Sequence, residues 1–198
     1  MRILLIGGTG TLGSAVHKAL TGRGHEVVTV ARGDGDLRYD ITDPAQITAL
    51  YAEAGRVDAV ASAAGSVPYR PFAELTPDDF TAAFRGKVLA QIELVRQGLD
   101  HVAERGSFTL ITGVLARVPV LTGSAASAAN GALEAFVRAA AVEIAPRRVN
   151  AVSPTVFTES LGRYGSVFPG MRPVPLAEVA DAYVRSVEGA QTGQVYEL

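Results

Sequence analysis

Short apolar runs alternate with segments of helical periodicity from the start of the chain. Residues 2–6, with the sequence RILLI, form an apolar run that ends at glycines, as is typical of a strand buried on both faces of a parallel sheet. Over residues 12–20 the apolar positions change to helical spacing, and Gly22 and Gly24 end the predicted helix. Residues 26–31, EVVTVA, restart an apolar strand. These segments predict one βαβ unit.

The same alternation continues to the end of the chain. A helix is predicted from Asp43 and Pro44 to about Ala54, and a long helix reaching into the nineties is predicted from a cap at residues 76–79. The other predicted strands are residues 57–65, 107–112, 148–153 and 194–198, and the other helices are residues 124–145 and 176–187. Residues 162–175, rich in glycine and proline, predict a mobile surface segment. This order predicts an α/β fold, with a doubly wound parallel sheet in a single domain of residues 1–198.

Composition and charge narrow the classes of function. Hydrophobic residues make up 48% of the 198 residues and the formal net charge is -2, which favours neither disorder nor a nucleic-acid partner. There is no cysteine, and three scattered histidines predict no metal site. No apolar run approaches the ~18 residues of a membrane span, and the start lacks the apolar region of a signal peptide. We therefore expect a cytoplasmic protein without membrane partners, which binds a small-molecule substrate or none.

Three glycines mark the turn from the first predicted strand into the first helix. Gly7, Gly10 and Gly13 are each separated by two residues. Without a Cβ atom, Gly7 permits a tight turn, Gly10 lets the backbone approach a pyrophosphate, and Gly13 allows the helix to pack closely on the sheet. The alternative is a glycine-rich turn without a ligand. The strand before the turn and the helix after it favour a dinucleotide site.

The end of the second predicted strand bears on the choice of cofactor. An acidic residue there would accept the ribose hydroxyls of NAD, but the chain has Ala31 followed by Arg32. A guanidinium binds a 2′-phosphate in a fork, so this position favours NADP. NAD remains the alternative, since Arg32 can instead be a solvated strand end, with Asp34 or Asp36 reaching the ribose.

Several separate stretches resemble motifs of the short-chain dehydrogenase/reductase family, and the likeness covers essentially the whole chain. GGTGTLG at 7–13 resembles its glycine-rich motif, DITD at 40–43 its adenine-contacting segment, SAAG at 62–65 its Asn-Asn-Ala-Gly strand end, and RVNAVSPT at 148–155 its Asn-x-x-x-Pro-Gly segment. The resemblance implies a Rossmann fold. The predicted cofactor-binding positions are Gly7, Thr9, Gly10, Thr11, Leu12, Gly13, Ala31, Arg32, Asp40, Ile41, Ala63, Ala64, Gly65, Pro154, Val156 and Thr158.

The positions that carry the family's chemistry do not match. Members of the family reduce carbonyls with a tyrosine acid, a lysine four residues later, a serine on the preceding strand and an asparagine on the long helix. The resemblance places the tyrosine at Ala126, the lysine at Asn130, the serine at Gly113 and the asparagine at about Lys87. The chain is thus similar to a short subgroup that lacks the usual active-site residues and whose function is undetermined.

The remaining polar residues offer weak substitutes for the missing catalytic groups. Lys87 and Asn130 are the candidates. Lys87 lies beside an apolar stripe that would lower its pKa, although we expect its stem to pack on this stripe while its ammonium reaches water. Asn130 can bind the nicotinamide ribose. Glu134 and Arg138 predict an exposed i, i+4 pair, and Ser127 a bond to a local carbonyl. Loop residues Tyr69 and Tyr164 are predicted near the cleft without a catalytic role.

Three functions stay open on this basis. The first is an NADP-dependent oxidoreductase acting on a small carbonyl or alcohol with a non-standard active site. The second is a catalytically inactive NADP(H)-binding sensor or scaffold subunit, and the third is a non-redox enzyme such as an isomerase or cyclase. Small residues in helix 124–145 permit close helix contact, and family members associate through this helix and the long one. A homodimer or homotetramer is therefore expected.

Overall fold

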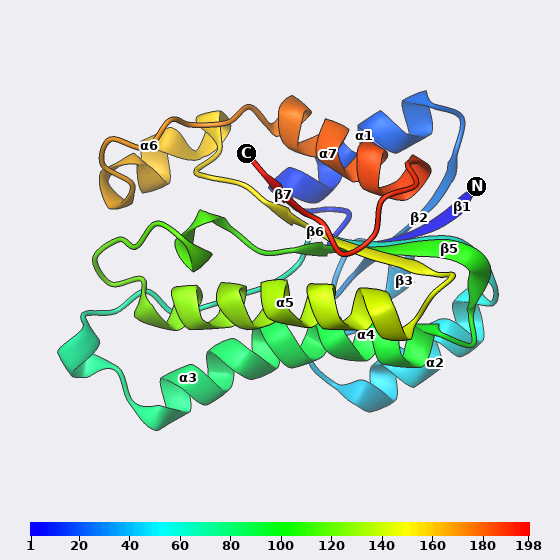
Figure 1. Ribbon diagram of the computed structural model, residues 1–198, viewed down its shortest axis with the longest axis horizontal. Coiled ribbons are helices and arrows are strands. Elements are labelled where there is room, and N and C mark those ends of the chain that lie inside the picture. Colours follow the sequence, from blue (N-terminus) through cyan, green and yellow to red (C-terminus); the bar gives the residue numbers. More distant parts are fainter.

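Seven parallel strands form one sheet through the middle of the molecule, and the computed structural model describes residues 1–198 (Figure 1). The strands are β1 (Arg2–Ile6), β2 (Glu26–Ala31), β3 (Leu37–Arg38), β4 (Val57–Ser62), β5 (Val102–Ile111), β6 (Arg148–Ser153) and β7 (Val195–Glu197). Their order is β3-β2-β1-β4-β5-β6-β7, and every neighbouring pair is parallel. The doubly wound prediction is confirmed. The strand order reverses between β1 and β4, so the carboxyl ends of these strands are where such a fold holds a ligand.

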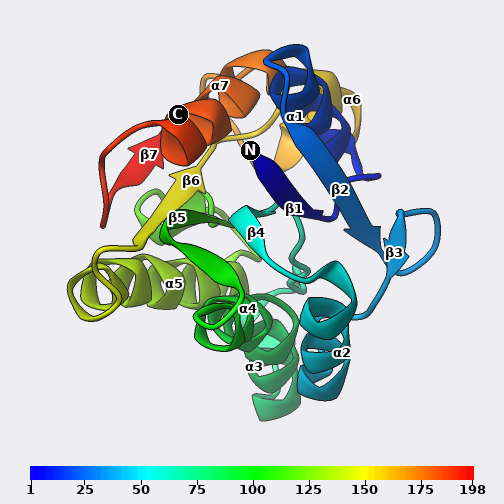
Figure 2. The same cartoon turned by 90° about the vertical axis from the view of Figure 1, so that its right-hand side faces the viewer.

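Helices cover both faces of the sheet (Figures 1 and 2). One face carries α1 (Thr11–Gly22) and α7 (Leu176–Glu188). The other face carries α2 (Pro44–Ala54), α3 (Pro77–Ala83), α4 (Ala90–Gly98) and α5 (Ser124–Glu143). The short helix α6 (Leu161–Tyr164) lies beyond the carboxyl ends of the strands. The sheet is therefore closed off from water except at its edges and ends.

β1 is apolar from Ile3 to Ile6 because helices cover both faces of the sheet. Leu4 and Ile6 belong to the core cluster beneath α2, α4 and α5, whereas Ile3 and Leu5 belong to the cluster beneath α1 and α7. All four side chains are buried. Successive side chains of a strand point to opposite faces, so a strand covered on both sides has to be apolar at every position.

The predicted long helix is real but not regular. Its cap is a reciprocal pair: the Asp79 amide donates to the Thr76 hydroxyl at 3.2 Å, and the Thr76 amide donates to the Asp79 carboxylate at 2.9 Å. Between α3 and α4 the chain forms a π-helical segment, Phe84–Leu89, which contains Lys87. The wider turn changes which residues face the sheet, and such segments often occur at functional sites.

Some boundaries differ from the prediction. β5 begins at Val102 rather than 107. The sequence did not predict this first part because AERG, residues 103–106, has no apolar pattern. These residues fall within a register shift between the pairs Val57–Val102 and Ala59–Ser107. The two-residue β3 was too short to predict. The expected surface segment 162–175 contains part of α6 and a 3-10 turn, Gly165–Val167.

Helix α5 offers a matched test of the core. Val137 is completely buried, whereas Val142 on the same helix is 80% exposed. Val137→Ala is expected to lower the free energy of unfolding by about 2 kcal/mol, because it removes buried methyl groups and leaves a void. Val142→Ala should be neutral or slightly stabilising, since alanine favours a helix more than valine does. Urea titration of both variants checks this, and equal losses would contradict the described packing of α5.

Candidate functional site

The turn between β1 and α1 depends on three glycines, which have no side chain. Gly7 has φ +75°, and its amide donates to the Val30 carbonyl at 2.7 Å, which ties the turn to β2. The Gly10 amide donates to the Gly7 carbonyl at 3.0 Å. A Cβ atom on Gly13 would overlap that same carbonyl oxygen. The spacing of the glycines is therefore a steric requirement of this turn.

The first turn of α1 is open to an anion. Its N-cap is Gly10, no side chain caps the helix, and the first turn contains no acidic residue. The unpaired N–H groups and the helix dipole favour negative charge at this end. The residues present thus fit the pyrophosphate of a dinucleotide.

The acidic alternatives near Arg32 are already engaged in part. Asp36 accepts from the Thr29 hydroxyl at 2.6 Å and from the Thr29 amide at 2.8 Å, and these bonds hold the pKa of Asp36 below its usual value. Both bonds go to Oδ2 of Asp36, and Asp36, Asp34 and Arg32 are all exposed after β2. Asp40 accepts from the Thr42 amide, which lowers the pKa of Asp40.

A cleft of about 690 Å³ opens at the carboxyl ends of the central strands. It is lined by predicted positions from six separate parts of the chain: Thr11, Leu12, Ala63, Gly65, Lys87, Gly113, Asn130, Pro154 and Val156. Thr158 is exposed and is not among the lining residues. A hollow of about 750 Å³ at the opposite end, near Arg23 and Arg148, contains none of the predicted positions and is more open. The cleft at the carboxyl ends is therefore the candidate site.

Lys87 projects from the π-helical segment into this cleft. Its side chain is only 9% exposed, and Nζ donates to the backbone carbonyl of Thr112 at 3.1 Å. The stem lies against Gly65, where an added Cβ would come within 3.0 Å of Cγ. Burial lowers the pKa of Lys87 to about 8. The expectation that the ammonium reaches water was wrong, because the wide turn directs the residue towards the sheet.

Asn130 lies across from the end of β5 and has no partner. The residue is 3% exposed, Oδ1 is buried without a hydrogen bond, and Nδ2 makes none either. An added Cβ on Gly113 would lie 3.2 Å from Nδ2. One turn earlier on α5, Ala126 is 1% exposed and brings no polar group.

Glu134 is not the exposed partner of Arg138 that the i, i+4 spacing predicted. Its side chain is 8% exposed, and its carboxylate accepts from Arg117 at 2.7 Å, from Ser153 at 2.9 Å and from the Thr112 hydroxyl at 3.2 Å. Arg117 also lies 3.3 Å from Glu197. The interaction fixes the loop after β5 against α5 and β6. Sequence spacing missed it because Arg117 is seventeen residues away along the chain.

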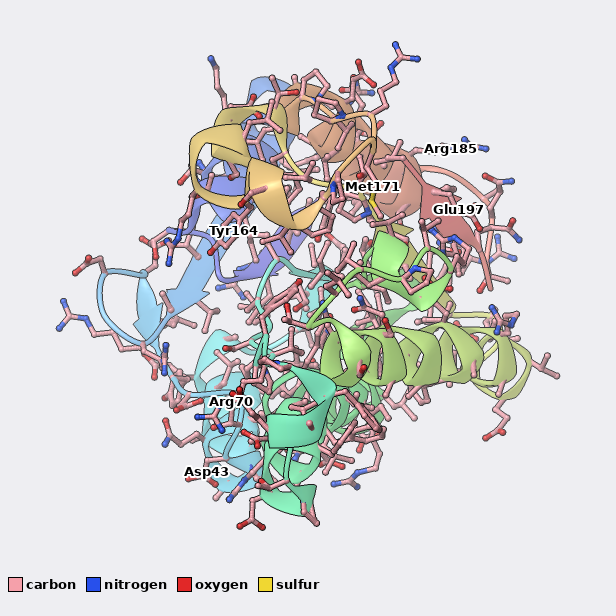
Figure 3. All side chains as sticks on the ribbon, turned by 90° about the vertical axis from the view of Figure 1, so that its left-hand side faces the viewer. Asp43, Arg70, Tyr164, Met171, Arg185 and Glu197 are labelled. Carbon is pink, nitrogen blue, oxygen red and sulfur yellow. The ribbon has the colours of Figure 1, made fainter.

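Aromatic residues form the outer part of the cleft. Tyr69 and Tyr164 both line it, and burial raises the pKa of the Tyr69 phenol. Figure 3 looks onto this end of the molecule and shows Tyr164 on α6. Phe157 and Phe168 also line the cleft and were not predicted. Ser127 forms no side-chain hydrogen bond, contrary to the bond expected with a local carbonyl.

The sequence analysis did not identify Thr112 as a site residue, although its position after a buried strand indicated one. It lines the cleft, and it connects Lys87 through its carbonyl and Glu134 through its hydroxyl. A polar residue directly after a buried parallel strand lies at the edge where ligands bind. That rule would have selected Thr112.

Comparison with known proteins identifies the family. The sequence profile described as enoyl-(acyl carrier protein) reductase matches residues 10–174. Versicolorin reductase stcU of Emericella nidulans is 29% identical over 179 residues, covering 77% of this chain and 68% of that protein. The chain belongs to the short-chain dehydrogenase/reductase family. Human L-xylulose reductase is 28% identical and covers 82% of this chain and 74% of its own length.

Two solved structures superpose on the whole chain. The protein lin1944 from Listeria innocua has a TM-score of 0.98 and 45% identity, covering 100% of this chain and 99% of that one. A small-chain dehydrogenase in complex with NADPH has a TM-score of 0.88 and 25% identity, covering 100% and 96%. These matches show the Rossmann fold and support binding of a nicotinamide cofactor. No helix of the chain has the length and apolar character needed to cross a membrane.

Two glycines of α1 give a matched test of the phosphate site. Gly13→Ala places a methyl group on the Gly7 carbonyl, whereas an added Cβ on Gly22 meets nothing within 4 Å. We expect Gly13→Ala to weaken binding of NADPH at least tenfold, and Gly22→Ala to bind it normally. Isothermal titration calorimetry measures both affinities. Undiminished binding by Gly13→Ala would place the dinucleotide elsewhere.

The pair of partly exposed Arg117 and buried Glu134 predicts a non-additive effect on stability. Arg117→Met leaves a buried carboxylate without its cation and should lower the free energy of unfolding by about 2 kcal/mol, less than for a fully buried pair because water reaches the Arg117 side. Adding Glu134→Leu should restore much of that loss, because the unpaired charge is then gone. Arg138→Met, on the exposed face of α5, is the control and should change stability little. Urea unfolding of the four variants, including Glu134→Leu alone, completes the double-mutant cycle.

Proposed function

We propose that this chain is an NADP(H)-dependent oxidoreductase that interconverts a small carbonyl compound and its alcohol. The observation that carries the proposal is the position of the 690 Å³ cleft, which begins at the uncapped first turn of α1 and continues along the ends of the central strands. A dinucleotide whose pyrophosphate lies at α1 would extend its nicotinamide into this cleft. The NADPH bound to a structural neighbour supports the same assignment.

The cofactor half of the site can be divided among the predicted positions. The N–H groups at Thr11 and Leu12 take the pyrophosphate, and Arg32 takes the 2′-phosphate. Ala63, Ala64 and Gly65, at the end of β4, provide a smooth wall for the adenosine and ribose. Pro154, Val156 and Thr158 are assigned to the nicotinamide side by resemblance. When bound, a reduced nicotinamide supplies hydride to the carbonyl carbon.

The proposed chemical half departs from the usual arrangement of the family. Ala126 stands at the tyrosine position, Asn130 at the lysine position and Gly113 at the serine position, so none of these provides an acid. The lining instead combines apolar walls with the single buried ammonium of Lys87.

A non-catalytic nucleotide binder is the second candidate. Buried Ala126 favours it, since hydride transfer to a carbonyl builds negative charge that a positioned acid normally neutralises, worth about 10²–10⁴ in rate. In that case the protein would bind NADPH, change its partners or assembly on binding, and turn over no carbonyl.

Arg32 provides the test of cofactor choice. Arg32→Ala should weaken NADPH binding about tenfold or more, because a charge-assisted bond to phosphate is lost, and should leave NADH binding nearly unchanged. Arg56→Ala is the matched control, because exposed Arg56 precedes β4 at the opposite end of the sheet. Calorimetry with both cofactors gives the affinities, and screening with NADPH and a panel of small aldehydes and ketones gives turnover. Tight NADPH binding without any substrate-dependent oxidation would favour the second candidate.

A further inference from the structure

The proton source is the part of the chemistry that the family's usual residues leave open in this chain. We propose that Lys87 and Asn130 form an oxyanion site, in which Lys87 donates a proton to the carbonyl oxygen of the substrate while Asn130 fixes that oxygen. The inference rests on the proposed oxidoreductase function. It assigns the acid to the π-helical segment Phe84–Leu89, which packs beside α5. The resemblance placed the missing tyrosine and lysine on α5 itself.

Lys87 has donors to spare at the base of the cleft. An ammonium carries three N–H groups, and the hydrogen bond to the Thr112 carbonyl uses one of them. No other protein acceptor binds Nζ, and the side chain is part of the cleft lining. The anchored stem and the single fixed bond hold the amine in one place. The other N–H groups are therefore available to a ligand oxygen.

Asn130 has an unsatisfied amide at the same place. Buried side-chain oxygens in native proteins nearly always have a hydrogen-bond partner, but Oδ1 of Asn130 has none. No hydrogen bond joins Asn130 to Lys87, although they flank consecutive residues, Thr112 and Gly113. An alcohol oxygen can accept from Nζ, and it can donate to the Asn130 oxygen once the amide turns that buried atom towards the cleft. A carbonyl oxygen can accept from Nζ and Nδ2 together.

Two glycines leave room for Lys87 and Asn130 in the cleft. A Cβ atom at position 113 would lie 3.2 Å from Nδ2 of Asn130, and one at position 65 would lie 3.0 Å from Cγ of Lys87. Gly65 matches the glycine of the family's strand-end motif, whereas Gly113 stands where the resemblance placed the serine. The missing serine side chain thus leaves space beside the Asn130 amide.

The charges around Lys87 leave its proton available. Tyr69, Tyr164, Glu159 and Arg163 line the rest of the cleft, and none of them is bonded to Nζ. Glu134, behind Thr112, is already paired with Arg117. Desolvation alone lowers the pKa of Lys87, to about 8, so the amine is mostly protonated at pH 7 and is acidic enough to transfer its proton.

The proposed step balances in protons and electrons. The carbonyl carbon receives a hydride from the reduced nicotinamide, which is oxidised, and the C=O π bond becomes a lone pair on oxygen. That oxygen takes a proton from Nζ of Lys87, which leaves a neutral amine and an alcohol. The amine regains its proton from water that enters the cleft after the alcohol has left. In the reverse direction, the neutral amine accepts the alcohol proton.

Binding of p-nitrophenol tests the oxyanion site without any turnover. Its anion alone is yellow and it ionises near neutral pH, so the absorbance of the bound form reports whether the site prefers the oxyanion. The wild type is expected to bind the anion, more weakly above about pH 8 as Lys87 loses its charge. Lys87→Met should weaken binding about 10–100-fold, as expected for losing a charged hydrogen bond. Lys87→Arg should bind without the decline above pH 8, because a guanidinium keeps its proton.

The chain contains two lysines, which provides a readout that needs no variant. Lys18 is exposed on α1 and is not among the residues that line the cleft. With ¹³C-labelled lysine, nitrophenol should shift the Lys87 resonance and leave the Lys18 resonance in place. Lys18→Met is the matched control for the binding assay, and calorimetry with NADPH shows that each variant keeps its fold. Equal nitrophenolate binding by wild type and Lys87→Met, or an unmoved Lys87 resonance, would overturn the proposal.

Turnover separates this proposal from the function on which it rests. If a carbonyl substrate is reduced and Lys87→Met keeps the wild-type kcat, the oxidoreductase function stands and Lys87 is not the acid. If nitrophenolate binds at Lys87 but no carbonyl in the panel is reduced, the oxyanion site stands and the reductase function fails. Loss of kcat in Lys87→Met with NADPH affinity unchanged supports both.

Discussion

The close approach of α1 to the turn that precedes it is the constraint on which the nucleotide half of this structure depends. A single Cβ at Gly13 would meet the Gly7 carbonyl, which itself accepts the Gly10 amide and closes the turn. Because the helix starts so near the sheet, its free N–H groups lie at the ends of β1 and β4. The anion site, the strand reversal and the mouth of the cleft therefore coincide.

The chemical half is organised in the same way around the end of β5. The Thr112 carbonyl accepts a hydrogen bond from Lys87, and the Thr112 hydroxyl donates one to Glu134. Thr112 therefore connects the π-helical segment before α4 with α5. Arg117 completes the connection by neutralising Glu134 beneath the loop. Removing the charge of Glu134 from water is tolerable because three side chains donate hydrogen bonds to its Oε1, one of them the charged Arg117.

A buried lysine without a carboxylate partner is costly, and the cost takes the form of a lowered pKa. The same desolvation that penalises the ammonium makes it a stronger acid near neutral pH. Asn130 carries a second cost, an unpaired buried oxygen. A ligand oxygen between Lys87 and Asn130 would supply hydrogen-bond partners to both side chains. The free energy lost by burying these unpaired groups would then be recovered on binding.

The sequence by itself determined the order of strands and helices, the parallel sheet and the glycine-rich turn. Each of these depends on neighbours within a few residues: apolar runs such as RILLI, the cap at Thr76, and the even spacing of Gly7, Gly10 and Gly13. Only the tertiary structure decided that Lys87 is buried and that Glu134 pairs with Arg117 rather than Arg138. Lys87 lies in a π-helical turn that directs it inward. Arg117, the partner of Glu134, comes from a loop that folds back over α5. Such contacts depend on segments far apart in the chain, which no local spacing records.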